Sequence, residues 1–250
     1  MTQIFEPFML SLLAGLATGL GGIIVVILKK VSNRIVSFSM GFASGVMLLV
    51  AFNNLFLQAS GLLSQIQLIL TFSLGAIMMI LLDLVLPHIE LTSRTNTEVS
   101  SKNYKTGVLI AIGITIHNFP EGVVVAAGYV HEPRLGLIIA IAILFHNIPE
   151  GIATAIPLAI AQTKRSKISL LTLLSGLTEP IGALIGAIAL SSIGSQLVVG
   201  SSLAFAAGVM TYITADELIP VAHEYGYKHT VSTSLLLGII FALLINVILS

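Results

Sequence analysis

The sequence ITIHNFPEG at Ile114–Gly122 returns as ILFHNIPEG at Ile143–Gly151, and each copy lies within a long apolar stretch. In both copies a His and a Glu are four residues apart, so they share one face of a helix about a turn apart. Ionisable groups at membrane depth are costly and by default indicate a functional site. Neither stretch contains Lys or Arg. We therefore expect a cation from outside the chain to balance the carboxylates.

The composition is that of a protein that crosses a membrane several times. Of 250 residues, 56% are hydrophobic and 9% are charged, whereas soluble domains carry about 25% charged residues. The absence of cysteine excludes disulfides and thiolate metal sites. A formal net charge of zero argues against a nucleic-acid partner. The expected surroundings are a lipid bilayer.

Eight apolar stretches are each long enough to cross a bilayer as a helix, which takes about 20 residues. They cover residues 8–28, 35–57, 66–86, 106–128, 135–161, 168–192, 197–221 and 231–249. The sequence thus predicts an all-α, polytopic integral membrane protein with eight transmembrane helices in a single domain, residues 1–250.

Basic residues distinguish the two sides of this predicted protein. Every lysine and arginine except Arg134 follows the first, third, fifth or seventh span. Cytoplasmic loops carry the excess of basic residues. Both termini are therefore expected on the extracellular or periplasmic side, and the short loop 91–105 in the cytoplasm.

The first three spans resemble the last three at an offset of about 161–163 residues. LSLLAGLATGLGG (Leu10–Gly22) aligns with LTLLSGLTEPIGA (Leu171–Ala183), and GFASGVMLLVAFNNLFLQA (Gly41–Ala59) aligns with AFAAGVMTYITADELIPVA (Ala204–Ala222). A third alignment pairs Gly75 with Gly238. Chance similarity among Leu-, Gly- and Ala-rich helices is the alternative, and three consecutive spans at nearly one offset argue against it.

Aligned spans are five apart, an odd number, so the two copies have opposite orientations in the membrane. Inverted repeats are typical of secondary transporters, whose substrate site lies near the bilayer midplane. The predicted arrangement is 3+2+3. It comprises a first repeat (1–90), the cytoplasmic loop (91–105), a central metal-binding helix pair (106–161) and the second, inverted repeat (162–250).

The central pair is expected to hold a divalent metal. Packing two antiparallel HN-x-PEG helices at their midpoints brings together two imidazoles, two carboxylates and two amides. Crowded carboxylates repel in a low dielectric, and a divalent cation removes that repulsion. Imidazole with carboxylate suits Zn, Fe, Co, Ni or Mn. The predicted metal-binding residues of the pair are His117, Asn118, Glu121, His146, Asn147 and Glu150.

Two residues of other spans are candidates for the same pocket. Glu179, in the TEP of the sixth span, is a third carboxylate near mid-depth, and a helix contact at a proline kink is its alternative role. Met47 offers a soft thioether ligand, and a place in the apolar core is its alternative. Six acids and none of the bases lie inside the spans, which suits a path for cations.

With this orientation, the third and seventh spans run inward and end in acidic and His residues. Weak successive sites of this kind suit release of a metal to the cytoplasm, and solvated loop residues are the alternative for some of them. The predicted exit path comprises Asp83, His88, Asp216, Glu217, His223 and Glu224.

With these motifs the chain resembles the ZIP (Zrt/Irt-like) divalent metal transporters, in particular their compact prokaryotic-type branch. HNFPEG, HNIPEG, TEP and DELIP…HE carry the resemblance, which extends over nearly the whole chain. It implies eight helices, a homodimer, and movement of spans 1, 4, 5 and 6 against 2, 3, 7 and 8. A multi-pass location in the plasma membrane, for a bacterium the inner membrane, follows from it.

The resemblance also implies a binuclear site. One metal would be held by His117, Glu121, His146 and Glu150, with Met47 as a further ligand. The second would be held by Asn118, Asn147 and Glu179, with Glu121 and Glu150 bridging the two.

The chain departs from many relatives late in the second span, where Asn54 and Leu57 replace a Glu and a Pro. The loop between the third and fourth spans is also short, with His88 as its lone histidine. The expected function remains uptake of a divalent transition metal, foremost Zn²⁺ as the transported ion, into the cytoplasm without enzymatic activity. An intramembrane zinc-dependent hydrolase is the alternative, although neither motif reads H-E-x-x-H.

Overall fold

The computed structural model describes residues 2–28, 31–85, 98–193, 195–226 and 228–249. Within these ranges every regular element is a helix, which confirms the all-α class. In chain order the elements are α1 (Thr2–Leu28), α2 (Asn33–Leu49), η1 (Val50–Phe56), α3 (Leu57–Leu62), α4 (Gln65–Val85), α5 (Glu98–His131), α6 (Pro133–Ile160), α7 (Arg165–Gly176), α8 (Thr178–Ile193), α9 (Gln196–Ile213), η2 (Thr214–Leu218), α10 (Ile219–Tyr225) and α11 (Lys228–Leu249).

Helix ends occur where the sequence offers caps or breakers. The Ser32 hydroxyl accepts a hydrogen bond from the Ile35 amide at 3.4 Å and caps α2. Pro133 opens α6, where its missing N–H costs no helical bond. The described part of α5 runs from Glu98, and neither Gly nor Pro interrupts residues 98–106. Residues 98–105 of the loop predicted at 91–105 are therefore helical, and 91–97 lie outside the described residues.

Seven segments of the described chain are long and apolar enough to cross a membrane. They are Gln3–Leu28, Asn33–Leu62, Gln65–Leu84, Pro133–Ile160, Arg165–Ser192, Gln196–Tyr225 and His229–Leu249. Each corresponds to one predicted span. The remaining predicted span, the fourth in chain order (residues 106–128), lies in α5, which packs against α6 and α8 within the same bundle.

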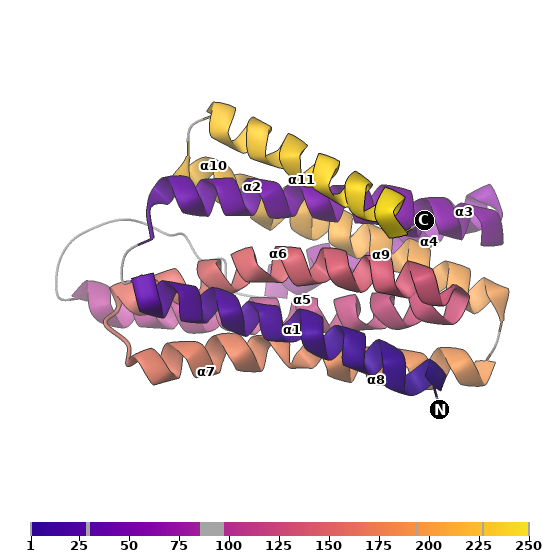
Figure 1. Ribbon diagram of the computed structural model, residues 1–250, viewed down its shortest axis with the longest axis horizontal. Coiled ribbons are helices and arrows are strands. Elements are labelled where there is room, and N and C mark those ends of the chain that lie inside the picture. Colours follow the sequence, from indigo (N-terminus) through magenta and orange to yellow (C-terminus); the bar gives the residue numbers. More distant parts are fainter. Residues whose placement is uncertain (1, 29–30, 86–97, 194, 227, 250) are drawn as a thin grey trace.

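Both ends of the chain lie at the same end of the bundle (Figure 1). There the Arg134 side chain, in the first turn of α6, donates through Nε to the carbonyl of Leu249 in α11. An even number of crossings returns a chain to the side from which it started. The arrangement is thus compatible with the eight spans expected from the sequence.

The helices form two groups (Figure 1). One contains α1, α5, α6, α7 and α8, and the other contains α2, α3, α4, α9, α10 and α11 with the two η segments. The groups meet where α2 packs on α6 and α9 packs on α5. The larger hydrophobic core lies along this boundary and includes Met47, Ile143 and Met210.

Two close helix contacts in the second group involve residues that the repeat alignment pairs with each other. A Cβ built on Gly75 would lie 2.0 Å from the Phe205 carbonyl oxygen, and one on Gly238 would lie 2.1 Å from that of Phe42. Glycine is required at both positions because the backbones approach too closely for a side chain. The sequence alignment pairs Gly75 with Gly238 and Phe42 with Phe205. The α4–α9 and α2–α11 contacts therefore follow the same pairing as the aligned sequences.

Three helices depart from a regular α-helix near the middle of the bundle. The π-helical segments η1 and η2 occur at aligned places in the second and seventh predicted spans. Such widened turns are frequent at functional sites. The sixth predicted span is divided, because α7 ends at Gly176 and α8 begins at Thr178. The sequence predicted none of these three interruptions at residue level.

Candidate metal centre

The two HN-x-PEG copies lie on α5 and α6, which pack against each other. Pro120 and Pro149 cannot donate to the carbonyls of Ile116 and Phe145, so each helix loses one internal hydrogen bond beside its motif. Gly122 lies against the Glu179 carbonyl oxygen of α8, only 1.8 Å from where a Cβ would stand. Small residues thus let the neighbouring helices close around the motif.

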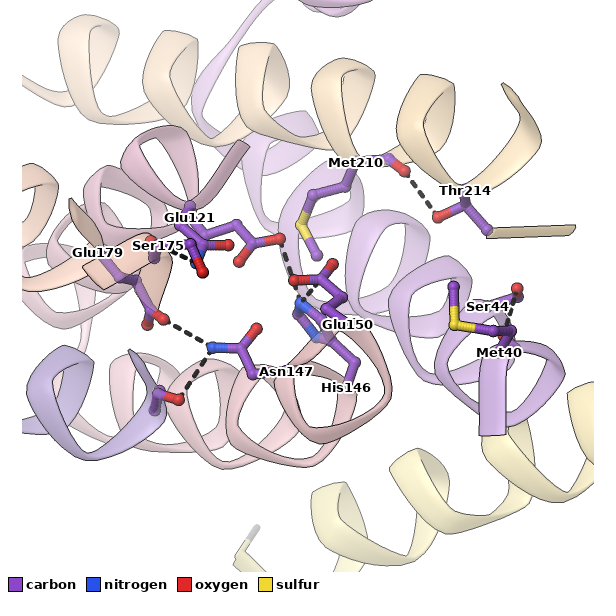
Figure 2. A network of polar contacts seen from close by, with 12 residues as sticks. Met40, Ser44, Glu121, His146, Asn147, Glu150, Ser175, Glu179, Met210 and Thr214 are labelled. Atoms are coloured by element: carbon purple, nitrogen blue, oxygen red, sulfur yellow. Dashed lines mark hydrogen bonds and ion pairs between the residues drawn. The ribbon is translucent and has the colours of Figure 1, made fainter. Parts of the chain in front are cut away.

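A compact cluster forms from Glu121 of α5 with His146 and Glu150 of α6 (Figure 2). His146 Nε2 lies 3.1 Å from Glu121 Oε1 and 3.9 Å from Glu150 Oε1. One ligand atom from each of the three residues lies within 4.8 Å of the other two. Glu121 and His146 are completely buried and Glu150 is 4% exposed.

The chemistry of this cluster suits a divalent transition metal. Its donors are one imidazole nitrogen and two carboxylates, a set that zinc and its neighbours accept. Glu121 Oε2 and Glu150 Oε2 are buried and have no hydrogen-bond partner within the described ranges. Buried carboxylate oxygens are expensive to leave unpaired. A cation bound among them would satisfy both.

A second group of polar side chains adjoins the cluster (Figure 2). Asn147 donates through Nδ2 to Glu179 Oε2 at 2.7 Å and to the Ala14 carbonyl at 2.9 Å. Asn118 donates through Nδ2 to the Ser175 carbonyl at 3.0 Å. The structure therefore brings Asn147 and Glu179 into direct contact, as expected for two residues of one subsite.

Three oxygens of this second group lack partners. Asn118 Oδ1, Asn147 Oδ1 and Glu179 Oε1 are buried and accept no hydrogen bond from any residue that the structure describes. The backbone carbonyls that hold the amide nitrogens leave the amide oxygens free as acceptors. Oxygen atoms of this kind are suitable cation ligands.

His117 occupies a different position from the one expected. Its Nε2 lies 3.4 Å from Oε1 of Glu217, in η2, and it is not part of the three-residue cluster. His117 itself is buried, whereas the Glu217 side chain is 41% exposed. The expected pairing of both imidazoles with both motif carboxylates is thus realised for His146 and not for His117.

Met47 lies fully buried in the hydrophobic core on α2. Figure 2 shows another thioether, that of Met210 on α9, extending toward the carboxylates of Glu121 and Glu150. Met210 is also fully buried. Met210 was not predicted from the sequence, although the repeat alignment pairs it with Met47.

The residues of the predicted exit path are spread over three elements. Asp83, near the end of α4, accepts a hydrogen bond from Tyr212 Oη at 3.1 Å. Tyr212 was not expected from the sequence. Asp216 and Glu217 belong to η2, and His223 and Glu224 are exposed on α10. His88 lies outside the described residues.

Asn54 also has a specific partner. Its Nδ2 donates to Asn246 Oδ1 at 2.7 Å, and Asn246 Nδ2 donates back to Asn54 Oδ1 at 3.2 Å. This reciprocal amide pair joins η1 to α11. The departure noted late in the second span is therefore a neutral, self-satisfied contact between two helices.

Comparison with known proteins identifies similar chains. A family model described as "ZIP Zinc transporter" matches residues 90–246. The chain is 40% identical over 244 residues to the zinc transporter ZupT of Chlorobaculum parvum, covering 91% of each chain. It is 35% identical over 240 residues to the zinc transporter ZupT of Streptococcus mutans, again covering 91% of each. To the Clostridium perfringens protein of the same name it is 34% identical over 269 residues, covering 96% of this chain and 94% of the relative.

Proposed function

Because the chain belongs to the ZIP family of zinc transporters, we propose that it carries divalent transition metal ions, foremost Zn²⁺, across a membrane into the cytoplasm. The path runs through the cluster of Glu121, His146 and Glu150. The metal is the transported substrate and the protein is not an enzyme. The relatives described above are named as transporters, and nothing in the site favours the hydrolase alternative.

The buried cluster is the single observation that carries this proposal. Two carboxylates and an imidazole meet inside a membrane-type bundle. Among the described residues, neither Glu121 nor Glu150 has a Lys or Arg partner. A bilayer cannot hydrate such charges. A divalent cation supplies the missing positive charge. Transport of such a cation explains why two carboxylates lie buried inside the bundle.

A second ion position adjoins the first. Asn118, Asn147 and Glu179 provide its oxygens, and Glu121 and Glu150 bridge to the first position. The contact between Asn147 and Glu179 supports this grouping. The unpartnered oxygens of all three residues support it as well. His117 joins the first position when the ion is present, exchanging its contact with Glu217.

Metal leaves from the middle of the bundle past η2, toward the end at which α10 lies. Glu217 links the buried His117 to the surface, because its side chain is 41% exposed. Asp83 and Asp216 lie on the same route, followed by His223 and Glu224. Basic residues concentrate on the connections at this end of the predicted topology, which supports a cytoplasmic exit and outer termini.

The counterpart contacts of the two helix groups support an inverted repeat in the 3+2+3 arrangement. The group formed by α1, α5, α6, α7 and α8 carries the ion and moves against the other group. The exposed apolar residues of α4 and α11 are available for lipid and for a second copy in a homodimer. The membrane is the plasma membrane, in a bacterium the inner membrane.

Flux measurements test this proposal. Purified protein in liposomes is loaded with an internal metal indicator and offered Zn²⁺, Cd²⁺, Fe²⁺, Mn²⁺ and Co²⁺, with and without a pH gradient. We expect Zn²⁺ influx, and loss of influx in Glu121→Ala. The matched control is Glu132→Ala, which removes an exposed acid in the turn between α5 and α6. Full influx through Glu121→Ala would refute the assigned path.

A further inference from the structure

The two motif asparagines make equivalent contacts with two different helices, α1 and α7. Asn147 Nδ2 donates to the Ala14 carbonyl of α1 at 2.9 Å, and Asn118 Nδ2 donates to the Ser175 carbonyl of α7 at 3.0 Å. In the repeat alignment Ala14 and Ser175 are counterparts. The site is therefore built from two half-sites that share one backbone design.

The residues next to these carbonyls are counterparts too. A Cβ on Gly151 would lie 1.9 Å from the Thr18 carbonyl oxygen, and one on Gly122 would lie 1.8 Å from the Glu179 carbonyl oxygen. Thr18 therefore packs against α6 as Glu179 packs against α5. At this one place the two half-sites differ in chemistry, with a neutral hydroxyl in one and a carboxylate in the other.

The Thr18 hydroxyl is unusual among the buried threonines of the described chain. Thr154, Thr172 and Thr214 each donate to the carbonyl four residues earlier. Thr18 is fully buried, and within the described residues its Oγ1 has no hydrogen-bond partner. A buried unpartnered hydroxyl requires an explanation.

The repeat alignment and the two asparagine contacts make Asn118 with Thr18 the counterpart of Asn147 with Glu179. Asn118 Oδ1 is buried and accepts no hydrogen bond from the residues that the structure describes. In the other half-site the equivalent amide, Asn147, contacts Glu179 directly. A threonine is too short to repeat that contact as a carboxylate does, which leaves two neutral oxygens available to a ligand.

We propose that Thr18 and Asn118 form a neutral, oxygen-only half-site that contacts the transported cation opposite the Asn147–Glu179 half-site. The inference rests on the proposed transport function. Neutral oxygens bind a divalent ion less strongly than a carboxylate does. The ion is therefore held firmly on the Glu179 side and loosely on the Thr18 side. This difference sets the affinity for the ion without adding another fixed charge.

The test compares Thr18→Val with Thr18→Ser in the liposome influx assay. Valine keeps the shape and removes the hydroxyl, so KM for Zn²⁺ should rise about threefold to tenfold at an unchanged maximal rate, as the loss of one ordinary polar interaction predicts. Serine should restore the wild-type KM. Thr172→Val is the matched control, since it removes a buried hydroxyl that already bonds the Ile168 carbonyl.

A swap of the two half-sites provides the sharper result. Glu179→Thr alone should reduce influx at least about tenfold, and the double variant Thr18→Glu/Glu179→Thr should recover a substantial part of it. A wild-type KM in Thr18→Val, or a double variant no better than Glu179→Thr, overturns the inference. If Glu121→Ala still abolishes influx in either case, the transport proposal stands and only the half-site fails.

Discussion

The two copies of the HN-x-PEG motif are nearly identical in sequence and differ in what their histidines contact. His146 on α6 lies between Glu121 and Glu150 and is completely buried. His117 on α5 instead reaches Glu217, whose side chain is 41% exposed. One copy thus completes the candidate metal cluster, and the histidine of the other contacts a partly exposed carboxylate. The motif therefore supplies a set of donor groups, and the neighbouring helices determine which contacts those groups make.

The neighbours responsible are the second and seventh predicted spans. α9 packs on α5, where Glu217 of η2 reaches His117, and α2 and η1 pack on α6. The repeat alignment pairs Glu217 of η2 with Asn54 of η1. Asn54 is neutral and already bonded to Asn246, so it offers His146 no charged partner. His146 therefore turns to the motif carboxylates.

The largest effect is expected where the two copies are alike. Glu150→Ala, the counterpart of Glu121→Ala, should lower Zn²⁺ influx more than about 100-fold, because removing a direct metal ligand exceeds the cost of losing a supporting contact. Influx into liposomes measures it, with protein yield in the membrane as the control. Influx within a few-fold of wild type would show that the two carboxylates are not equivalent.

Substituting the histidines tests the difference directly. His146→Ala should cost about 100-fold in kcat/KM for influx, and His117→Ala about tenfold, because His146 already lies within the three-residue cluster, whereas His117 joins the ion only by giving up its contact with Glu217. Initial rates over a range of Zn²⁺ concentrations separate KM from the maximal rate. Equal losses in the two variants would mean that the histidines act symmetrically during transport.

Glu217→Gln should have a smaller effect of a different kind. Because Glu217 lies between the buried centre and the surface, we expect about a threefold to tenfold lower maximal rate with KM little changed. The double variant His117→Ala/Glu217→Gln should cost no more than His117→Ala, as expected for residues in contact. Additive losses would separate the two residues functionally.

The smallest effect concerns the neutral counterpart of Glu217. Asn54→Leu should lower the stability of the bundle by about 0.6–1.7 kcal/mol, the range found for hydrogen bonds between membrane helices. Asn54→Leu/Asn246→Leu should recover part of this loss, because no amide then remains unpaired. Thermal unfolding in detergent measures both. A single variant as stable as wild type would leave the amide pair without a structural role.

Much of the fold could be predicted from local sequence. Apolar runs in the sequence predicted all seven helical segments that are long and apolar enough to cross a membrane. The remaining predicted span, residues 106–128, lies within α5. The sequence did not predict that α5 includes residues 98–105, because polar helical residues give no hydropathy signal. The π-helical segments η1 and η2 were also missed. Their widened turns depend on packing with neighbouring helices, which local composition does not encode.

For the candidate site, the sequence predicted which side chains could bind a metal, and the structure shows which of them contact one another. Glu121, His146 and Glu150 were expected together and lie together. Three features were not anticipated: the contact of His117 with Glu217, the position of the Met210 thioether near the carboxylates, and the hydrogen bond from Tyr212 to Asp83. Each involves residues that are far apart in the chain.

Residue types and their spacing alone place two His/Glu pairs within apolar helices, predict a cation beside them, and reveal that the chain repeats itself around them. These inferences follow from residue type and spacing, since about four residues make one helical turn whatever the tertiary context. Which histidine meets both carboxylates, and which helices Thr18 and Glu179 pack against, follows from the packing of the helices. Those relations depend on how closely the backbones approach at Gly122 and Gly151, and such distances arise from packing between distant segments.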